Sequence, residues 1–305
     1  MIFFITGASS FVGIEVCRYL SDKGHDIIAM SRRDNDQLNA IAQSGHLRVF
    51  RADMQTLVDK ATDVKADVFI HLAWAGTSHE ERNNLAIQEE NVRLSLEYVR
   101  FAKRMGCQLY VDAGSQAEYG IVPGIITEET ECHPVIPYGK AKLQLYKKTS
   151  TLVEQLGLKY IHLRIFSVYG ENDHDETLIK SSIKKLRDGN PIAMASGGQM
   201  WNYIYVKDAA RQIVKLSIYA VNYEDFKQEV FNIASNDTRR LQDFVITMKE
   251  VWGSASELSF SGYNKYKDVN LNPDISKTAS IVKPLTKWNF ESVIRNMKKH
   301  ILSLN

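Results

Sequence analysis

Three side chains with proton-transfer chemistry stand close together in the middle of the chain. Tyr138 and Lys142 are four residues apart, and Ser115 precedes Tyr138 by 23 residues. Residues four apart lie on the same side of a helix, so the ammonium of Lys142 should stabilise the Tyr138 phenolate and lower its pKa. Ser115 supplies a hydroxyl that can orient a substrate oxygen. The spacing therefore predicts a catalytic group that moves protons on and off that oxygen.

A glycine-spaced turn near the N-terminus is typical of a phosphate-binding site. The turn directly follows the apolar run Ile2 to Ile5. Gly7 permits a tight turn, and Gly13 lets a following helix pack closely on the strand, so that a pyrophosphate can sit on the helix N-terminus. Ser10 stands where a second glycine is usual, and its hydroxyl can donate to a phosphate instead. The expected cradle comprises Gly7, Ser9, Ser10, Phe11, Val12 and Gly13.

The end of the second apolar run bears on which dinucleotide binds. The chain reads Ser31-Arg32-Arg33 there, and the first carboxylate after this apolar run is Asp34. A ribose 2′-hydroxyl calls for an acidic acceptor, whereas a 2′-phosphate calls for cations. Arg32 and Arg33 therefore favour NADP(H). NAD(H) stays open, because paired arginines in a loop can also be simply solvated.

Residues after the next two apolar runs extend the expected cofactor site. Asp53, followed by Met54, is placed to accept a hydrogen bond from the adenine amino group. The small residues Ala73 and Ala75 allow the backbone to come close to the cofactor. We interpret His71 as a hydrogen-bonded histidine at a strand end rather than as a catalytic group.

Short apolar runs alternate with amphipathic segments through the first half of the chain. Strands are expected at Ile2–Ile5, Ile27–Met30, Leu47–Phe50, Val68–Leu72, Leu109–Ala113 and Tyr160–Phe166. Helices are expected near Val12–Asp22, Gln37–Gln43, Asn91–Met105 and Tyr138–Leu156. This alternation predicts an α/β fold with a doubly wound parallel sheet of the Rossmann kind, covered by helices on both faces.

The alternation of expected strands and helices becomes irregular after Gly170. A helix is expected over Leu178–Asp188, a strand over Trp201–Val206, a helix over Asp208–Tyr219 and a strand over Val230–Ala234. We therefore predict an NAD(P)-binding domain at 1–170 and, over 171–305, mainly a smaller substrate lobe at the carboxyl edge of the sheet. About 201–230 should return to the first domain.

Composition narrows the class of partner. The 38 basic and 36 acidic residues leave a net charge of +2, too small a field to favour nucleic acid or a membrane surface. No run approaches the ~20 apolar residues of a membrane span. The 3 cysteines lack paired spacing, which fits a reducing compartment. The acidic loop 171–176 is interpreted as solvated rather than metal-binding. We expect a cytoplasmic protein without nucleic acid, membrane or metal partners.

On these residues the chain resembles the extended short-chain dehydrogenase/reductase family, in its NAD(P)-dependent epimerase/dehydratase group that acts on nucleotide-activated sugars. The resemblance rests on the glycine turn, Asp53, the segment 71–75, Ser115 with Tyr119-Gly120, Tyr138 with Lys142, and the segment 164–170. It implies that Ser115, Tyr138 and Lys142 are catalytic, with Tyr138 and Lys142 also at the cofactor. It implies cofactor contacts from Leu72, Asn91, Phe166 and Val168, and substrate contacts from Trp74, Ser115, Gln116, Tyr169, Trp201 and Tyr203.

The resemblance also implies the ligand and the assembly. Its C-terminal lobe would hold a nucleotide diphosphate sugar, and the helix Asn91–Met105 resembles the element through which relatives form homodimers. Trp201 stands where many relatives carry an arginine near the phosphates of the nucleotide. Two interpretations of this residue stay open, stacking on the base and ordinary burial.

The choice of reaction follows from the residues next to Ser115. Relatives that dehydrate sugars place an Asp-Glu pair there, whereas this chain has Gln116 and Ala117, which transfer no proton. Glu118 is next and, on a strand-like segment, should face the other way. With Arg32 and Arg33 the chain favours NADPH-dependent reduction of a 4-keto-6-deoxyhexose nucleotide, similar to the 4-ketoreductases that make abequose. The alternatives are a nucleotide-sugar epimerase with retained NAD and a non-catalytic dinucleotide-binding sensor or scaffold.

Overall fold

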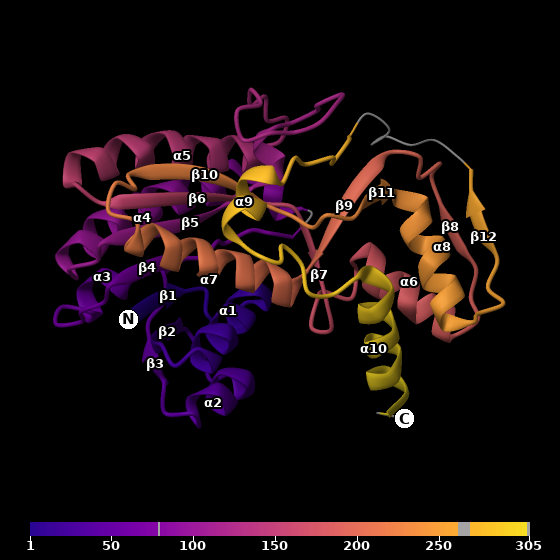
Figure 1. Cartoon of the computed structure of the whole chain (residues 1–305), viewed down its shortest axis with the longest axis horizontal. Helices are drawn as coiled ribbons and strands as arrows, with labels where there is room; N and C mark the ends of the chain where they lie inside the picture. Colours follow the sequence, from indigo (N-terminus) through magenta and orange to yellow (C-terminus); the bar gives the residue numbers. More distant parts are fainter. Residues whose placement is uncertain (79, 262–268, 304–305) are drawn as a thin grey trace.

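A sheet of seven parallel strands forms the centre of the protein (Figure 1). The computed structural model describes residues 1–78, 80–261 and 269–303. The strands lie in the order β10-β6-β5-β4-β1-β2-β3, with bounds β1 Ile2–Thr6, β2 Asp26–Ser31, β3 Leu47–Arg51, β4 Val68–His71, β5 Leu109–Ser115, β6 Lys159–Ile165 and β10 Gln228–Ile233. The prediction of a doubly wound α/β fold is confirmed.

Helices cover both faces of this sheet because alternate strand residues point to opposite sides. Phe3 and Ile5 of β1 are buried with α1 (Phe11–Asp22), α2 (Asp36–Ala42) and α7 (Val206–Asn222). Phe4 between them is buried on the other face, under α3 (Leu57–Lys60), α4 (Leu85–Arg104) and α5 (Pro137–Leu156). Both faces are apolar, which is why the strands appear in the sequence as short apolar runs.

Local signals explain where two site-forming helices begin. The α4 helix starts at Leu85, earlier than predicted, because the Asn84 side chain caps it by accepting from the Ile87 N–H at 3.3 Å. The α5 helix starts with Pro137 at its first position, where a missing N–H has no consequence. Both helices therefore present their first turns at the carboxyl edge of the sheet, where β4 and β5 also end.

A smaller lobe continues from that edge, at the right of Figure 1. It contains β7 (Ser167–Tyr169), β9 (Met200–Tyr205) and β11 (Thr238–Arg240) in one sheet, and β8 (Ile192–Met194) with β12 (Leu258–Phe260) in another. Its helices are α6 (Leu178–Arg187), α8 (Leu241–Trp252) and α10 (Phe290–Ser303), packed around one apolar cluster.

The chain passes between the two parts more than once. After β9 it returns as α7, which packs on α1, and as β10, which pairs with β6 at the sheet edge. The short α9 (Ser276–Ile281) also packs on α7 before the chain ends in the smaller lobe. The exact domain boundaries stay a prediction. Within the described part of the chain, no helix has the length and apolar character needed to cross a membrane.

Candidate active site

A pocket of about 850 Å³ lies at the carboxyl ends of β1, β2 and β4. It collects most of the residues predicted to hold the dinucleotide. The predicted residues that line it are Gly7, Ser9, Ser10, Ser31, Arg32, Asp53, Met54, Leu72, Ala73, Ala75 and Asn91, together with Trp74 from the substrate set.

The glycine turn forms the floor of this pocket. Gly7 has φ +68°, and a Cβ there would lie 2.6 Å from the Ala73 nitrogen. A Cβ on Gly13 would lie 2.1 Å from the Gly7 carbonyl oxygen. Ser10 caps α1, because its Oγ accepts from the Gly13 N–H at 3.1 Å, and its own hydroxyl proton stays available to a phosphate. A bare backbone beside a helix N-terminus fits a pyrophosphate group.

Four of the predicted cofactor residues do not line this pocket. Phe11 lines a neighbouring cleft of about 110 Å³, and Val12 packs against the apolar core. Phe166 is buried against Tyr119, and Val168 packs between the two lobes. The structure does not bring these four side chains to the 850 Å³ pocket, because each follows the apolar face of its element.

The end of β2 distinguishes the two predicted arginines. Arg32 lines the pocket, whereas Arg33 is exposed outside it. The Ser31 hydroxyl donates to the Arg33 carbonyl oxygen at 2.8 Å and fixes this turn. Asp34 forms an ion pair with Arg51 of β3. Hence the carboxylate nearest to Arg32 in the sequence is engaged by another arginine.

Hydrogen bonds hold the Asp53 and Asn91 side chains in place at the pocket. The Asp53 carboxylate accepts from the Thr56 hydroxyl and N–H, both at 2.8 Å, and from the Gln55 N–H, and these bonds lower its pKa. Asn91 accepts from the Ala75 N–H at 3.0 Å and donates to the Ala75 carbonyl oxygen at 2.9 Å. An ionised Asp53 and a fixed Ala75 backbone suit polar contacts to a nucleotide.

His71 has the structural character that was expected. Its ring nitrogens contact the Thr6 hydroxyl at 2.7 Å and the Ser95 hydroxyl at 2.8 Å. Burial, and then the charge of Lys142, lower its pKa to about 3. The ring is therefore neutral and joins β1, β4 and α4.

The three predicted catalytic residues converge beyond Trp74. Ser115 ends β5, and Tyr138 and Lys142 lie in the first turns of α5. The Ser115 side chain lies close enough to the Tyr138 phenol to lower its pKa. The Trp74 indole meets the Tyr138 ring edge-on at 6.3 Å between centroids. The indole thus links the proton-transfer group to the dinucleotide pocket.

The position of Lys142 differs from the sequence prediction. Its ammonium donates to the Ala113 carbonyl oxygen at 2.6 Å and lies 3.5 Å from the centroid of the Trp74 ring, but 5.7 Å from that of Tyr138. Burial raises the pKa of Tyr138, and the charge of Arg82 and the Ser115 side chain act against this rise. The expected lowering of the tyrosine pKa by Lys142 is therefore not seen, because the ammonium turns toward β5 and the indole.

Burial also acts on Lys142 itself. It lowers the pKa of the ammonium to about 7, while the charges of Asp112 and Glu118 raise it and that of Arg82 lowers it. At neutral pH both protonation states of Lys142 are therefore populated in this environment.

Arg82 is a residue of this site that the sequence did not indicate. Its guanidinium carbon lies 5.0 Å from the centroid of the Tyr138 ring, and its Nε donates to the Thr77 carbonyl oxygen at 2.8 Å. It lies in the short 3₁₀ helix η1 (Glu81–Asn83). The surrounding loop has no hydrophobic period, so no sequence signal could have placed this arginine over the phenol.

The segment that contains Glu118 also differs from the prediction, in its secondary structure. The segment Gln116–Glu118 is a 3₁₀ helix, η2, rather than a strand, because Ser115 caps it and the Glu118 side chain accepts from the Ser115 N–H at 2.7 Å. The carboxylate is fully buried against His162 and Arg164. It packs against β6, beneath the turn that begins at Ser115, which we call the catalytic turn.

The predicted substrate residues separate into two groups. Trp74, Ser115 and Gln116 lie at the proton-transfer site. Tyr169 is 2% exposed within the apolar cluster of the smaller lobe, and Tyr203 lines a separate pocket of about 460 Å³. Trp201 is partly buried on β9 against two apolar clusters, and its indole N–H finds no hydrogen-bond partner within the described residues. The structure therefore does not bring these three aromatics to the 850 Å³ pocket.

The chain is similar to one family model and to several curated proteins. The model of the NAD dependent epimerase/dehydratase family matches residues 3–234. The dTDP-6-deoxy-L-talose 4-dehydrogenase (NAD(+)) of Aggregatibacter actinomycetemcomitans is 25% identical over 79% of this chain and 87% of its own. The dTDP-4-dehydro-6-deoxyglucose reductase of Escherichia coli is 27% identical over 59% of this chain and 57% of its own.

A solved structure shows the same fold over the whole length. The crystal structure of UDP-glucuronic acid 4-epimerase from Bacillus cereus in complex with NAD superposes with a TM-score of 0.84. It covers 100% of this chain and 99% of its own at 18% identity. The similarity in fold therefore includes the smaller lobe, beyond the residues 3–234 that the family model matches.

Proposed function

The chain belongs to the NAD dependent epimerase/dehydratase family, and we propose that it reduces the 4-keto group of a 6-deoxyhexose carried on a nucleoside diphosphate, with NADPH as the hydride source. It is an enzyme of the extended short-chain dehydrogenase/reductase type that uses a nicotinamide dinucleotide. The two relatives described above are named for oxidation or reduction of dTDP-linked 6-deoxy sugars, and this supports the substrate class.

The observation that carries this proposal is Arg32 on the pocket at the end of β2. Its guanidinium suits a 2′-phosphate, and the nearby Asp34 is paired with Arg51, so repulsion of that phosphate is reduced. A preference for NADPH supports net reduction, because an epimerase returns its hydride to the same sugar and needs no reduced cofactor from the cell.

The chain's own groups support the proton chemistry. When bound, the dinucleotide supplies a hydride to the carbonyl carbon. Tyr138 then gives its hydroxyl proton to the carbonyl oxygen, which becomes an alcohol, and the Ser115 hydroxyl donates a hydrogen bond that orients this oxygen. Burial keeps the pKa of Tyr138 above its usual value, so the phenol holds its proton at neutral pH and is ready to act as an acid. The charge of Arg82, whose guanidinium carbon lies 5.0 Å from the centroid of the phenol ring, favours the phenolate left behind. The Lys142 ammonium lies 5.7 Å from the same centroid.

Dehydration is disfavoured by the same turn. Gln116 and Ala117 have no titratable group, and Glu118 is bound to His162 and Arg164 behind the site. A carboxylate engaged by two cations is a poor proton carrier for a sugar.

A nucleotide-sugar epimerase with retained NAD is the second candidate. It is favoured by the fold similarity to UDP-glucuronic acid 4-epimerase, which extends over the whole chain. The predicted alternative of a non-catalytic sensor or scaffold is set aside, because the family is one of enzymes and both Tyr138 and Lys142 are present.

The proposal is tested by incubating the protein with NADPH or NADH and a panel of nucleotide sugars. The panel contains 4-keto-6-deoxyhexoses on dTDP, CDP and UDP, together with UDP-glucose and UDP-glucuronic acid. Consumption of NADPH with a keto sugar, and faster than of NADH, is the expected result. Isomerisation of a UDP-sugar without loss of reduced cofactor would instead establish the epimerase.

A further inference from the structure

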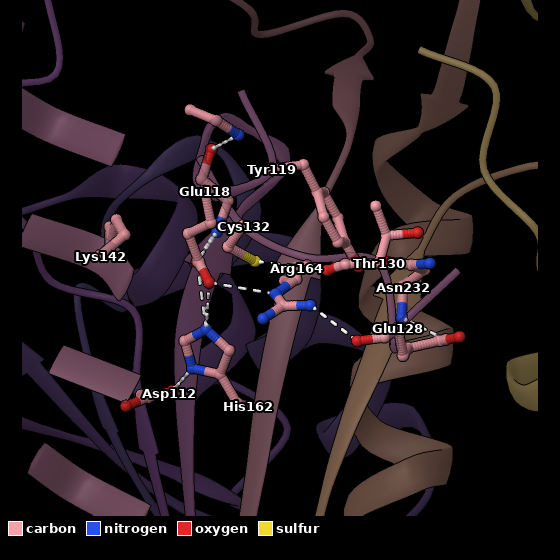
Figure 2. A network of polar contacts seen from close by, with 12 residues as sticks. Asp112, Glu118, Tyr119, Glu128, Thr130, Cys132, Lys142, His162, Arg164 and Asn232 are labelled. Carbon is pink, nitrogen blue, oxygen red and sulfur yellow. Dashed lines mark hydrogen bonds and ion pairs between the residues drawn. The ribbon is translucent and has the colours of Figure 1, made fainter. Parts of the chain in front are cut away.

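A buried histidine lies between two buried carboxylates directly behind the catalytic turn (Figure 2). The His162 Nδ1 lies 2.6 Å from the Asp112 Oδ1, and its Nε2 lies 3.0 Å from the Glu118 Oε2. All three side chains are 0% exposed. They come from β6, β5 and η2, and the mechanism above uses none of them.

The geometry makes this histidine a cation. Each ring nitrogen faces a carboxylate oxygen, so both nitrogens carry a proton. Burial alone would lower the pKa of His162, but Glu118 and Asp112 raise it to about 9. Arg164 adds a second cation, with its Nε 3.1 Å from the Glu118 Oε2. Two carboxylates and two cations thus form a cluster without net charge.

Glu118 connects this cluster to the catalytic serine. Its Oε1 accepts from the Ser115 N–H at 2.7 Å, and the Ser115 Oγ in turn accepts from the Ala117 N–H at 3.2 Å. A Cβ on Gly114 would lie 2.3 Å from the His162 Nε2, so only glycine allows the ring to approach so closely. The cluster therefore fixes the turn from which Ser115 projects.

The same carboxylates act on Lys142. This ammonium is 3% exposed, and it donates to Ala113, the residue after Asp112. Charge on Asp112 and Glu118 favours its protonated form, against the effect of burial. The charged or titratable groups that face it from the packed elements are Asp112 of β5, Glu118 of η2, Tyr138 of α5, His71 of β4 and Arg82 of η1.

We propose that Asp112, His162 and Glu118 are positioning residues of this active site, which hold the Ser115 turn in place and set the fraction of Lys142 that is protonated at neutral pH. The net charge of the cluster controls the protonated fraction of Lys142. Removing one carboxylate leaves an excess of positive charge near Lys142, and removing the imidazolium leaves an excess of negative charge. The inference rests on the proposed function only in treating Ser115 and Lys142 as catalytic.

The test measures the Lys142 ionisation directly, without cofactor or substrate. Protein labelled with [¹³C]lysine is titrated by NMR through the ¹³Cε resonance of Lys142, which is assigned by its absence in Lys142→Arg. The wild-type midpoint is expected at about 7. Glu118→Gln should lower this midpoint by about 1 pH unit, because His162 keeps its contact with Asp112 and stays charged, and His162→Gln should raise it by about as much.

Tyr160→Phe is the matched control. The Tyr160 hydroxyl donates to Asp112 at 3.1 Å inside the same cluster, and its removal changes no charge. It should leave the midpoint unchanged. If Glu118→Gln fails to fold by circular dichroism, Asp112→Asn replaces it with the same expected direction. Unchanged midpoints, or shifts of the same sign in the carboxylate and histidine variants, would overturn the proposal whether or not the protein reduces a keto sugar.

Discussion

The Lys142 ammonium lies 3.5 Å from the centroid of the Trp74 indole ring, closer than it lies to the phenol that it was expected to face. The indole N–H is fixed in turn by the Gln88 side chain at 2.8 Å. A cation over an indole face is stabilised by about 0.5–2 kcal/mol. Trp74 therefore holds Lys142 at the junction between the dinucleotide pocket and the proton-transfer group.

Loss of the Trp74 ring should weaken turnover through Lys142. Trp74→Leu removes the cation–π contact and is expected to lower kcat/KM by about 10-fold, since the contact is worth about 1 kcal/mol or more. Trp74→Phe keeps an aromatic face and should retain most of the activity. The measurement is steady-state kinetics with NADPH and the keto sugar of the panel that is reduced fastest. Equal losses in both variants would show that the aromatic face does not matter.

Removal of the Tyr138 hydroxyl should abolish proton transfer while leaving the cofactor site intact. Tyr138→Phe is expected to lower kcat by about 10²- to 10⁴-fold, the usual contribution of a positioned acid. The dissociation constant of NADPH, followed by its fluorescence, should change little, because the hydroxyl does not line the 850 Å³ pocket. Normal turnover in this variant would contradict the role assigned to Tyr138.

The two arginines after β2 should differ in their effect on cofactor choice. Arg32→Ala is expected to weaken NADPH binding by about 10- to 100-fold through the loss of charge-assisted hydrogen bonds, with little effect on NADH. Arg33→Ala is the matched control, since Arg33 is exposed outside the pocket. An unchanged NADPH to NADH ratio in Arg32→Ala would remove the argument for NADP(H).

The buried His162 predicts a pH-dependent difference in stability between the wild type and His162→Gln. Its folded pKa of about 9 lies above the ordinary 6.5, so its contribution is complete below pH 6.5 and is lost as the pH rises through 9. The wild-type advantage in the free energy of unfolding should therefore shrink by on the order of 2 kcal/mol across this window.

Lys142 contributes with the opposite sign in that window, because its folded pKa is lowered to about 7. It does not cancel fully, because the Lys142 midpoint is expected to rise by about 1 pH unit in His162→Gln, which offsets part of the shrinkage and keeps the net change on the order of 2 kcal/mol. Urea unfolding at closely spaced pH values measures the effect. A difference that stays constant from pH 6 to pH 9.5 would mean that His162 is not the charged group described above.

Assembly through α4 stays a prediction with a direct check. The exposed side of this helix carries Arg93, which is paired with Glu90 and Glu97 at 2.6 Å each. If α4 mediates a homodimer, light scattering should return twice the chain mass of 34.7 kDa, and Arg93→Glu should shift it toward the monomer through like-charge repulsion. A monomer mass for the wild type at working concentration would remove the prediction.

The sequence predicted those parts of the fold that depend on burial and turn chemistry. Strands of a parallel sheet are buried on both faces, so β1, β2, β4, β5 and β6 appear as apolar runs in the sequence. The glycine turn was predictable because Gly7 must adopt a positive φ beside Ala73. Helices α8 and α10 were not predicted, because their apolar stripes follow no strand in regular alternation.

The site was harder to predict where a side chain had several potential partners. Whether Tyr169 faces a ligand or the core depends on α10. The ring centroid of Phe290, in that helix, lies 5.2 Å from the ring centroid of Tyr169. Lys142 was within reach of Tyr138 by spacing, but a carbonyl group and an indole hold it instead. Glu118 was assigned to a strand, and only the cap formed by Ser115 turns the segment into a 3₁₀ helix.

The most direct test of the proposed reduction follows the hydride itself. NADPH carrying deuterium at nicotinamide C4 is incubated with the protein and a 4-keto-6-deoxyhexose nucleotide, and the product is analysed by NMR and mass spectrometry. The account predicts one deuterium at sugar C4 and one oxidised cofactor per product, with both lost in Tyr138→Phe. Formation of a sugar isomer without deuterium and without net cofactor oxidation would contradict it.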